Sequence, residues 1–187
     1  MDSSTHFPEF NERGDWRSQA AGFKQEVATL AGGCFWGMQE LFRSLPGVIN
    51  TQVGYTGGTL NHATYPGVRA GNSGHAEAIQ ILFDPQKTHF KEILLFFFKA
   101  HDPTQKNRQG GDIGSQYRSS IFFESDVQKV AAVEVMSKVE RSGKWGAPLV
   151  TEVVSASAFW RAEEDHQKYL IKNQQGYTCH FIRPMEF

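Results

Sequence analysis

A cysteine, Cys34, lies among glycines and aromatic residues in the segment GGCFWG, residues 32–37. The glycines end an apolar stretch that we expect to be a strand, and the residues after Cys34 follow a helical pattern. We therefore expect Cys34 at or beside a helix N-terminus, where unpaired N–H groups and the helix dipole favour a thiolate. Phe35 and Trp36 could supply an apolar wall for a ligand. This setting favours a reactive cysteine over a small buried hydrophobic residue.

Two other kinds of loop are excluded by the residues around Cys34. A phosphatase-like loop would carry an arginine six positions after the cysteine, where this chain has Glu40. A phosphate-binding loop would end in Gly-Lys-Ser or Gly-Lys-Thr, and this segment does not.

Glu77 ends the segment GHAE, residues 74–77, where a long loop is expected to enter a strand. His-x-Glu resembles the zinc deaminase signature, but that chemistry needs a downstream Pro-Cys-x-x-Cys, and the only cysteines are Cys34 and Cys179. We therefore expect no metal site. The motif alone leaves two interpretations of Glu77 open, a carboxylate aimed into a site and an edge-strand carboxylate in water.

A third cluster, GGDIGSQYRS, occupies residues 110–119 and contains Asp112, Tyr117 and Arg118. Gly, Asp and Ser suit a turn whatever the function is. Taken alone, this cluster predicts a loop and no particular chemistry.

The composition limits the possible partners. The 187 residues are 40% hydrophobic, which is enough for one domain with an ordinary core. The 19 basic residues nearly balance the 20 acidic ones, so we expect neither nucleic acid nor a membrane as partner. The first ten residues do not resemble a signal peptide, and the longest strongly apolar run, residues 93–98, is too short to cross a bilayer. We expect a cytoplasmic protein, in which two cysteines are more often catalytic or incidental than structural.

The elements that would position these residues alternate along the chain. We predict strands at residues 26–33, 48–55, 76–83, 119–123 and 149–155, and helices at 34–44, 88–100, from 125 to near 143, and at 162–173. This order predicts an α+β fold, a two-layer α/β sandwich with a ferredoxin-like core. We divide the chain into an N-terminal arm (1–26), a catalytic domain (27–173) and a C-terminal tail (174–187).

Together and in this order, the three clusters resemble the A-type peptide methionine sulfoxide reductases. GCFWG at residues 33–37 matches the active-site motif of that family, and GHAE matches its second block. HDPT at 101–104, NRQG at 107–110 and QYRS at 116–119 match its third block. The resemblance runs from about Val27 to Tyr177, and it is specific because several motifs carry it together.

The resemblance implies an enzyme that reduces methionine-S-sulfoxide, free or in proteins, to methionine. It implies Cys34 as nucleophile, Phe35 and Trp36 as the pocket for the methyl group, Glu77 as the acid at the sulfoxide oxygen, Tyr65 and Tyr117 as tyrosines that help to hold that oxygen, and Asp112 as an accompanying carboxylate. It implies no bound cofactor and an external dithiol such as thioredoxin as reductant. We expect the protein to be a monomer.

Sulfoxide chemistry fits these roles. The sulfoxide oxygen is a poor leaving group, so attack at sulfur needs donors that strengthen as the oxygen gains charge. Glu77 can donate near neutral pH only if burial raises its pKa. Attack leaves Cys34 as a sulfenic acid, and Cys179 is the only other thiol that could condense with it. We expect this to require a mobile tail.

The sequence departs from the family pattern at two places. Many members carry a further cysteine in the tail, whereas this tail holds Cys179 alone, and a cysteine frequent before the GHAE block is replaced by Arg69. The chain by itself can therefore run at most a two-cysteine cycle.

Two other functions stay open at this point. One is a cysteine hydrolase, which needs Cys34 within reach of His75 or His101. The other is a noncatalytic module that binds oxidised or apolar side chains in the Phe35–Trp36 pocket.

Overall fold

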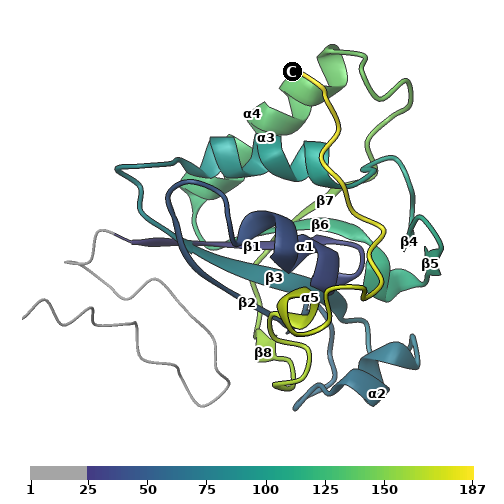
Figure 1. Cartoon of the computed structure of the whole chain (residues 1–187). Helices are drawn as coiled ribbons and strands as arrows, with labels where there is room; N and C mark the ends of the chain where they lie inside the picture. The colour runs from purple at the N-terminus through teal and green to yellow at the C-terminus, as the bar shows by residue number, and fades with distance from the viewer. Residues whose placement is uncertain (1–24) are drawn as a thin grey trace, which may run out of the picture.

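A six-stranded sheet runs through residues 25–187, the part of the chain that this computed structural model describes (Figure 1). In order across the sheet, its strands are β7 (Glu152–Ser155), β6 (Ser119–Phe123), β1 (Glu26–Gly32), β3 (Ala76–Phe83), β2 (Val48–Thr56) and β8 (Trp160–Arg161). Neighbouring strands are antiparallel, except that β6 and β7 are parallel. β1 and β3 bury nearly every residue, as suits strands inside a sheet with both faces covered.

Three longer helices pack against this sheet through one apolar cluster. α1 (Phe35–Phe42) follows β1, α3 (Phe90–Ala100) follows β3, and α4 (Asp126–Arg141) follows β6. The cluster includes Met38 and Phe42 of α1, Phe97 and Phe98 of α3, Val135 and Val139 of α4, and Leu30, Ile79 and Ile81 of the sheet. These buried contacts fix the N-terminus of α1 beside the end of β1.

The antiparallel register of β1 and β3 brings two of the sequence clusters together. Leu30 pairs with Ile79, so the end of β1 lies beside the start of β3. The glycine turn that carries Cys34 therefore lies next to Glu77, although 42 residues separate Phe35 from Glu77 in the chain.

Five short elements complete the described fold. They are α2 (Tyr65–Arg69), the strands β4 (Arg108–Gln109) and β5 (Asp112–Ile113), the 3-10 helix η1 (Ser115–Tyr117), and α5 (Tyr169–Lys172). β4 and β5 form a small antiparallel pair of their own. Three of the candidate residues, Tyr65, Asp112 and Tyr117, lie on these short elements.

Much of the predicted order is confirmed. The fold mixes helices with a mostly antiparallel sheet, and β3 and β6 have the predicted bounds. α4 begins at Asp126, next to the predicted start at 125, and its N-cap residue Ser125 accepts the Gln128 N–H at 3.2 Å. The long loop expected before the GHAE segment differs from the prediction, because it contains the short helix α2.

The predicted helix at 162–173 is wrong for most of its length. Only Tyr169–Lys172 is helical, and Lys168 just before it has a left-handed backbone, with φ of 52°. Hydrogen bonds to residues far away in the chain stabilise this conformation. The Gln39 side chain accepts the Lys168 N–H at 2.6 Å, and the Gln167 side-chain amide hydrogen-bonds to both the N–H and the C=O of Val53. The segment before it instead contributes β8, a strand that was not predicted and that pairs with β2.

The C-terminal tail crosses α1 and runs back toward α3 and α4 (Figure 1, yellow). His180 lies 2.7 Å from the carbonyl oxygen of Gly32, and the Arg183 N–H donates to the carbonyl of Lys99 at 3.1 Å. The tail is therefore docked on the domain in this structure, although a mobile tail was expected.

No helix within residues 25–187 is long and apolar enough to cross a membrane. The predicted arm at 1–26 lies almost wholly outside the described residues.

Candidate active site

Cys34 is the N-cap residue of α1, directly after β1 and its glycine turn, as predicted. Gly33 has φ of +102°, and a Cβ at this position would lie 2.6 Å from the Gln109 side chain. Both observations require glycine at the turn. Cys34 is 6% exposed, so the thiol lies at the bottom of the site and not on the surface.

Glu77 is buried beside Cys34. Its strand β3 lies between β1 and β2, its side chain is 4% exposed, and its Oε2 accepts the Phe35 N–H at 3.1 Å. Burial outweighs this bond and raises the pKa of Glu77 to about 8. The interpretation of Glu77 as an edge-strand carboxylate in water is therefore wrong, and the carboxyl can hold a proton at neutral pH.

The Cys34 thiol is protonated in this environment. The Trp36 N–H at the helix N-terminus lowers its pKa, but burial and the charge of Glu77 raise it well above the ordinary range. The helix terminus alone thus does not produce a thiolate here, contrary to the expectation from sequence. A negative charge on Glu77 opposes the ionisation of Cys34, so the protonation state of the thiol depends on that of the carboxyl.

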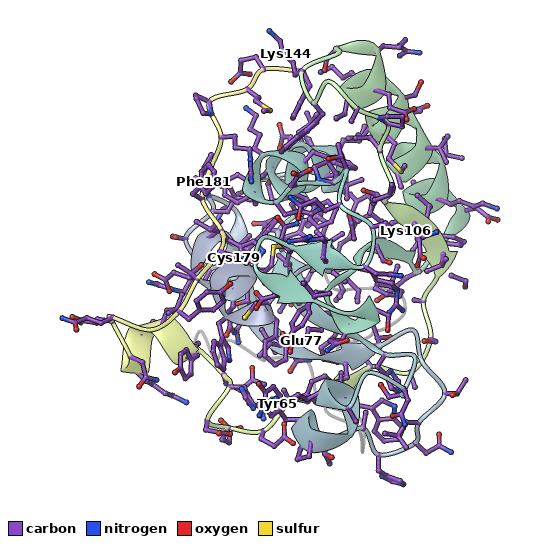
Figure 2. All side chains as sticks on the ribbon, turned by 90° about the vertical axis from the view of Figure 1, so that its right-hand side faces the viewer. Tyr65, Glu77, Lys106, Lys144, Cys179 and Phe181 are labelled. Atoms are coloured by element: carbon purple, nitrogen blue, oxygen red, sulfur yellow. The ribbon has the colours of Figure 1, made fainter. Side chains whose placement is uncertain are left out.

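Tyr65, Tyr117 and Asp112 surround this pair from three separate elements. Burial first, and then the charge of Glu77, raise the pKa of both tyrosines, so their hydroxyls stay protonated donors. The charge of Asp112 acts on Cys34, Glu77 and both tyrosines. In the view of Figure 2, Cys179, Glu77 and Tyr65 follow one another from top to bottom. The structure thus brings together residues that the sequence placed in different clusters.

The two aromatic residues after Cys34 have different surroundings. Phe35 is 1% exposed and packs inside a small cluster, with its ring centroid 5.7 Å from that of Tyr55. Trp36 is half-buried and stacks on Tyr169 at a centroid distance of 3.8 Å. Trp36 therefore offers the more accessible apolar surface, and Phe35 belongs to the buried cluster against which Trp36 packs.

Cys179 lies on the docked tail with its thiol between two acceptors. Its Sγ is 3.5 Å from Oδ2 of Asp112 and 3.5 Å from Nδ1 of His180. Burial first, and then the charge of Asp112, raise the pKa of Cys179 to about 11. The Tyr177 hydroxyl donates to the same Asp112 oxygen at 3.1 Å. Both cysteines are free thiols. Cys179 lies near enough to Cys34 for a charge on Cys179 to raise the pKa of Cys34.

Neither histidine named for a hydrolase is available to Cys34. His75 accepts the Gly58 N–H through Nδ1 at 3.1 Å, and its Nε2 bonds to the carbonyl of Leu60. His101 is fully buried between the carbonyl of Phe97 and the hydroxyl of Ser119, both at 2.7 Å. With both ring nitrogens occupied in each case, a Cys–His dyad has no support.

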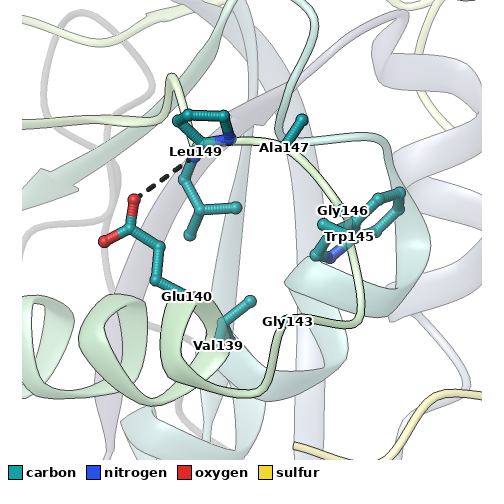
Figure 3. A pocket seen from close by; sticks show the side chains of 8 residues that line it. Val139, Glu140, Gly143, Trp145, Gly146, Ala147 and Leu149 are labelled. Carbon is teal, nitrogen blue, oxygen red and sulfur yellow. Dashed lines mark hydrogen bonds between the residues drawn. The ribbon is translucent and has the colours of Figure 1, made fainter.

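A separate hollow of about 380 Å³ lies in the loop after α4 (Figure 3). It is lined by Val139, Glu140, Gly143, Trp145, Gly146, Ala147, Pro148 and Leu149. Its charged lining residue, Glu140, already accepts the Leu149 N–H at 3.4 Å. None of these lining residues is a nucleophile or one of the candidate site residues.

Comparison with known proteins agrees with this geometry. The family profile described as peptide methionine sulfoxide reductase matches residues 26–186. The chain belongs to this family. A "Peptide methionine sulfoxide reductase MsrA" of Nocardia farcinica is 54% identical over 157 residues, which are 84% of this chain and 90% of that protein.

Two solved structures of a yeast protein are also similar to this chain. The reduced form of Mxr1 from Saccharomyces cerevisiae superposes with a TM-score of 0.80 and 37% identity, covering 86% of this chain and 93% of the yeast chain. Mxr1 in complex with Trx2 superposes with a TM-score of 0.58 and 25% identity, covering 86% of this chain and 91% of that one.

This family member has site residues that the motifs did not indicate, and they lie in the segment wrongly predicted as helix. The Glu163 carboxylate accepts the Tyr55 hydroxyl at 2.9 Å and the Tyr65 N–H at 2.8 Å. His166 accepts the indole N–H of Trp36 at 3.0 Å, and its ring lies 4.4 Å from that of Tyr65. Both residues therefore position aromatic side chains of the site. One signal was present, since residues 163–168 contain no apolar residue and so lack the face that an amphipathic helix needs.

Proposed function

We propose that this protein reduces methionine sulfoxide, free or in proteins, to methionine, with Cys34 as nucleophile and Cys179 as resolving thiol. The observation that carries the proposal is that the proposed acid lies beside the proposed nucleophile. A buried carboxyl, Glu77, bonds to the N–H of the residue that follows a buried thiol. An acid and a nucleophile in one buried site suit a reaction that must protonate an oxygen while sulfur is attacked.

In the first step, Sγ of Cys34 attacks the sulfoxide sulfur while Glu77 gives a proton to the sulfoxide oxygen. The thiol proton of Cys34 restores Glu77, so the pair exchanges protons without net loss. The S–O bond of the substrate and the new Sγ–S bond then break as the oxygen, with its proton, passes to Sγ. Cys34 is left as a sulfenic acid, oxidised by two electrons, and the sulfoxide is reduced to methionine, which is released. A pKa of about 8 lets Glu77 both give and regain a proton near neutral pH.

Tyr65, Tyr117 and Trp36 prepare the substrate for this step. The two phenols are protonated donors for the sulfoxide oxygen, and Asp112 accompanies them. Trp36 provides the accessible wall for the methyl group, with Phe35 beneath it. Donors that already face the site lose little energy in reorganising as charge develops on the oxygen.

In the second step, the Cys179 thiol condenses with the Cys34 sulfenic acid to give a disulfide and water. An external dithiol then reopens the disulfide by thiol exchange. We assign this role to a thioredoxin, and the solved complex of the yeast relative with Trx2 supports the assignment. The protein's own chemistry uses no prosthetic group.

We also propose specificity for the S epimer, in keeping with the A-type motifs, and a ferredoxin-like core. The order β6-β1-β3-β2 with α1 after β1 and α3 after β3 supports that core, because its four strands are mutually antiparallel neighbours. The cytoplasmic location, the monomeric state and the three-part division of the chain stay predictions.

Counting thiols against methionine tests the proposal. The reduced protein is mixed with one equivalent of methionine-S-sulfoxide without reductant, and free thiols and methionine are measured together. The proposal predicts that two thiols disappear for each methionine formed, and that the R epimer gives neither change. Methionine formed without loss of thiols, or an acyl-enzyme formed from ester substrates, would contradict it.

A further inference from the structure

His180 is a buried histidine whose two ring nitrogens both have partners at the site. The residue is 7% exposed. Its Nε2 lies 2.7 Å from the carbonyl oxygen of Gly32, and its Nδ1 lies 3.5 Å from Sγ of Cys179. The ring thus joins the turn before Cys34 to the second cysteine of the cycle.

The Gly32 contact determines which nitrogen carries the proton. A carbonyl oxygen only accepts, so Nε2 must be the donor. Burial lowers the pKa of His180 below its ordinary value, so the ring is neutral and Nδ1 keeps its lone pair. That lone pair faces the Cys179 thiol.

The ring is also fixed by close packing. A Cβ at Gly37 would lie 2.5 Å from Nδ1 of His180, and a Cβ at Gly33 would lie 3.2 Å from its Nε2. The imidazole therefore lies against the bare backbone of α1 and of the turn before it. These backbone contacts leave the ring little room to move relative to Cys34.

We propose that His180 is the catalytic base of the resolving step, with Nδ1 taking the Cys179 thiol proton as Sγ of Cys179 attacks the sulfenic sulfur of Cys34. This inference rests on the proposed function. The Sγ–Sγ bond forms, the S–O bond of the sulfenic acid breaks, and the leaving oxygen departs as water after regaining a proton from the imidazolium. The sulfenic acid is the oxidant, so the step needs no other reagent.

Asp112 is the alternative acceptor, and electrostatics favours His180 over it. The two acceptors lie at the same distance from Sγ, but Asp112 already accepts the Tyr177 hydroxyl. The negative charge of Asp112 raises the pKa of Cys179 and so opposes the thiolate. A proton on His180 places a positive charge beside the developing thiolate, and Asp112 favours that imidazolium. Asp112 thus holds the thiol at rest and stabilises the charged base.

His180→Gln separates the base from the anchor, because a glutamine amide can still donate to the Gly32 carbonyl but cannot take a proton. Methionine release and loss of the second thiol are followed in one turnover with methionine-S-sulfoxide. We expect methionine release within twofold of wild type, disulfide formation slower by about 10²-fold, and a sulfenic acid that a trapping reagent labels. Methionine release also serves as the folding control.

The pH profile of disulfide formation distinguishes a base from an anchor. The charged or titratable groups that face the ring are Asp112, Cys179, Arg183 and His101. In His180→Gln the rate should rise about tenfold per pH unit between pH 7 and 9, following the Cys179 thiolate, whereas the wild-type rate should stay nearly level. Asp112→Asn is the comparison variant for the alternative base.

Three results would overturn the inference. The first is disulfide formation in His180→Gln at the wild-type rate, and the second is a large loss in Asp112→Asn with no change in His180→Gln. The third needs no variant: ¹⁵N NMR of the reduced wild-type protein showing the ring proton on Nδ1 instead of Nε2. If the wild type itself forms methionine without losing both thiols, the proposed function fails first and the two failures are distinguished.

Discussion

Oε2 of Glu77 lies 3.1 Å from the amide nitrogen of Phe35, so the proposed acid is hydrogen-bonded to the residue that follows the proposed nucleophile, Cys34. The bond occupies the first free N–H of α1, which would otherwise be available to an anion at the helix terminus. Burial first, and then the charge of Glu77, raise the pKa of the Cys34 thiol. The proposal therefore has Cys34 enter the reaction as a thiol and pass its proton to Glu77.

Glu77→Gln should slow methionine formation in a single turnover by about 10² to 10⁴-fold, since the amide keeps the shape and the buried position but cannot give a proton. Substrate binding should change little, because the amide still hydrogen-bonds to the sulfoxide. Rapid-quench measurement of methionine at saturating substrate gives the rate. Glu92→Gln, the same change at an exposed position of α3, is the control and should react at the wild-type rate. A wild-type rate in Glu77→Gln would leave the carboxyl without a chemical role.

Glu77 should also make the folded protein less stable as pH rises. Its pKa is raised from 4.5 to about 8 on folding, so between these values the folded state binds more protons than the unfolded state. The stabilising contribution is fully present below about pH 4.5 and is lost as pH rises through 8. The urea midpoint of wild type should fall between pH 6 and pH 9, and that of Glu77→Gln should fall less. Equal losses in both proteins would assign the effect to other groups.

His101 should have the opposite dependence on pH. Burial lowers its pKa from 6.5 to about 3, so the unfolded chain binds a proton that the folded protein excludes. Stability should fall as pH drops from about 6.5 toward 3, by a few kcal/mol in total. His101→Asn should be less stable at pH 7, because the bonds to Phe97 and Ser119 change. Its urea midpoint should nevertheless decline less steeply between pH 7 and pH 4.

Cys179→Ala should form about one equivalent of methionine and then stop. The Cys34 sulfenic acid persists because no second thiol condenses with it, and a trapping reagent should label it. Thioredoxin should fail to support turnover, whereas a small thiol such as dithiothreitol should restore it by direct attack on the sulfenic acid. Continued turnover of Cys179→Ala with thioredoxin would show that Cys34 is regenerated from outside the chain.

Local patterns in the sequence were enough to predict the strands that precede Cys34 and carry Glu77, but not the short elements that carry Tyr65, Asp112 and Tyr117. The apolar run ending in glycines predicted β1 and the turn before Cys34, and the run at 76–83 predicted β3, because burial and glycine conformation are local requirements. The segment at 162–173 was not predictable in this way. Its backbone is set by bonds from Gln167 to Val53 and from Lys168 to Gln39, which only the folded chain creates.

The electrostatics of the site also depend on the fold. The sequence places Cys34 at a helix N-terminus, but the pKa of its thiol follows burial and Glu77, which the neighbouring residues in the chain do not reveal. Cys179 likewise lies near the site because His180 contacts Gly32, 148 residues away. The sequence could therefore name the candidate residues, whereas the shifts of their pKa values required the packed structure.

The most direct test of the account is methionine formation by Cys34→Ser. A serine hydroxyl is not ionised near neutral pH and is far less nucleophilic than sulfur, so the variant should form no methionine in a single turnover while unfolding in urea close to wild type. Cys179→Ser, with Cys34 intact, is the matched control and should form about one equivalent. Methionine produced at a measurable rate by folded Cys34→Ser would contradict the assignment of Cys34 as nucleophile.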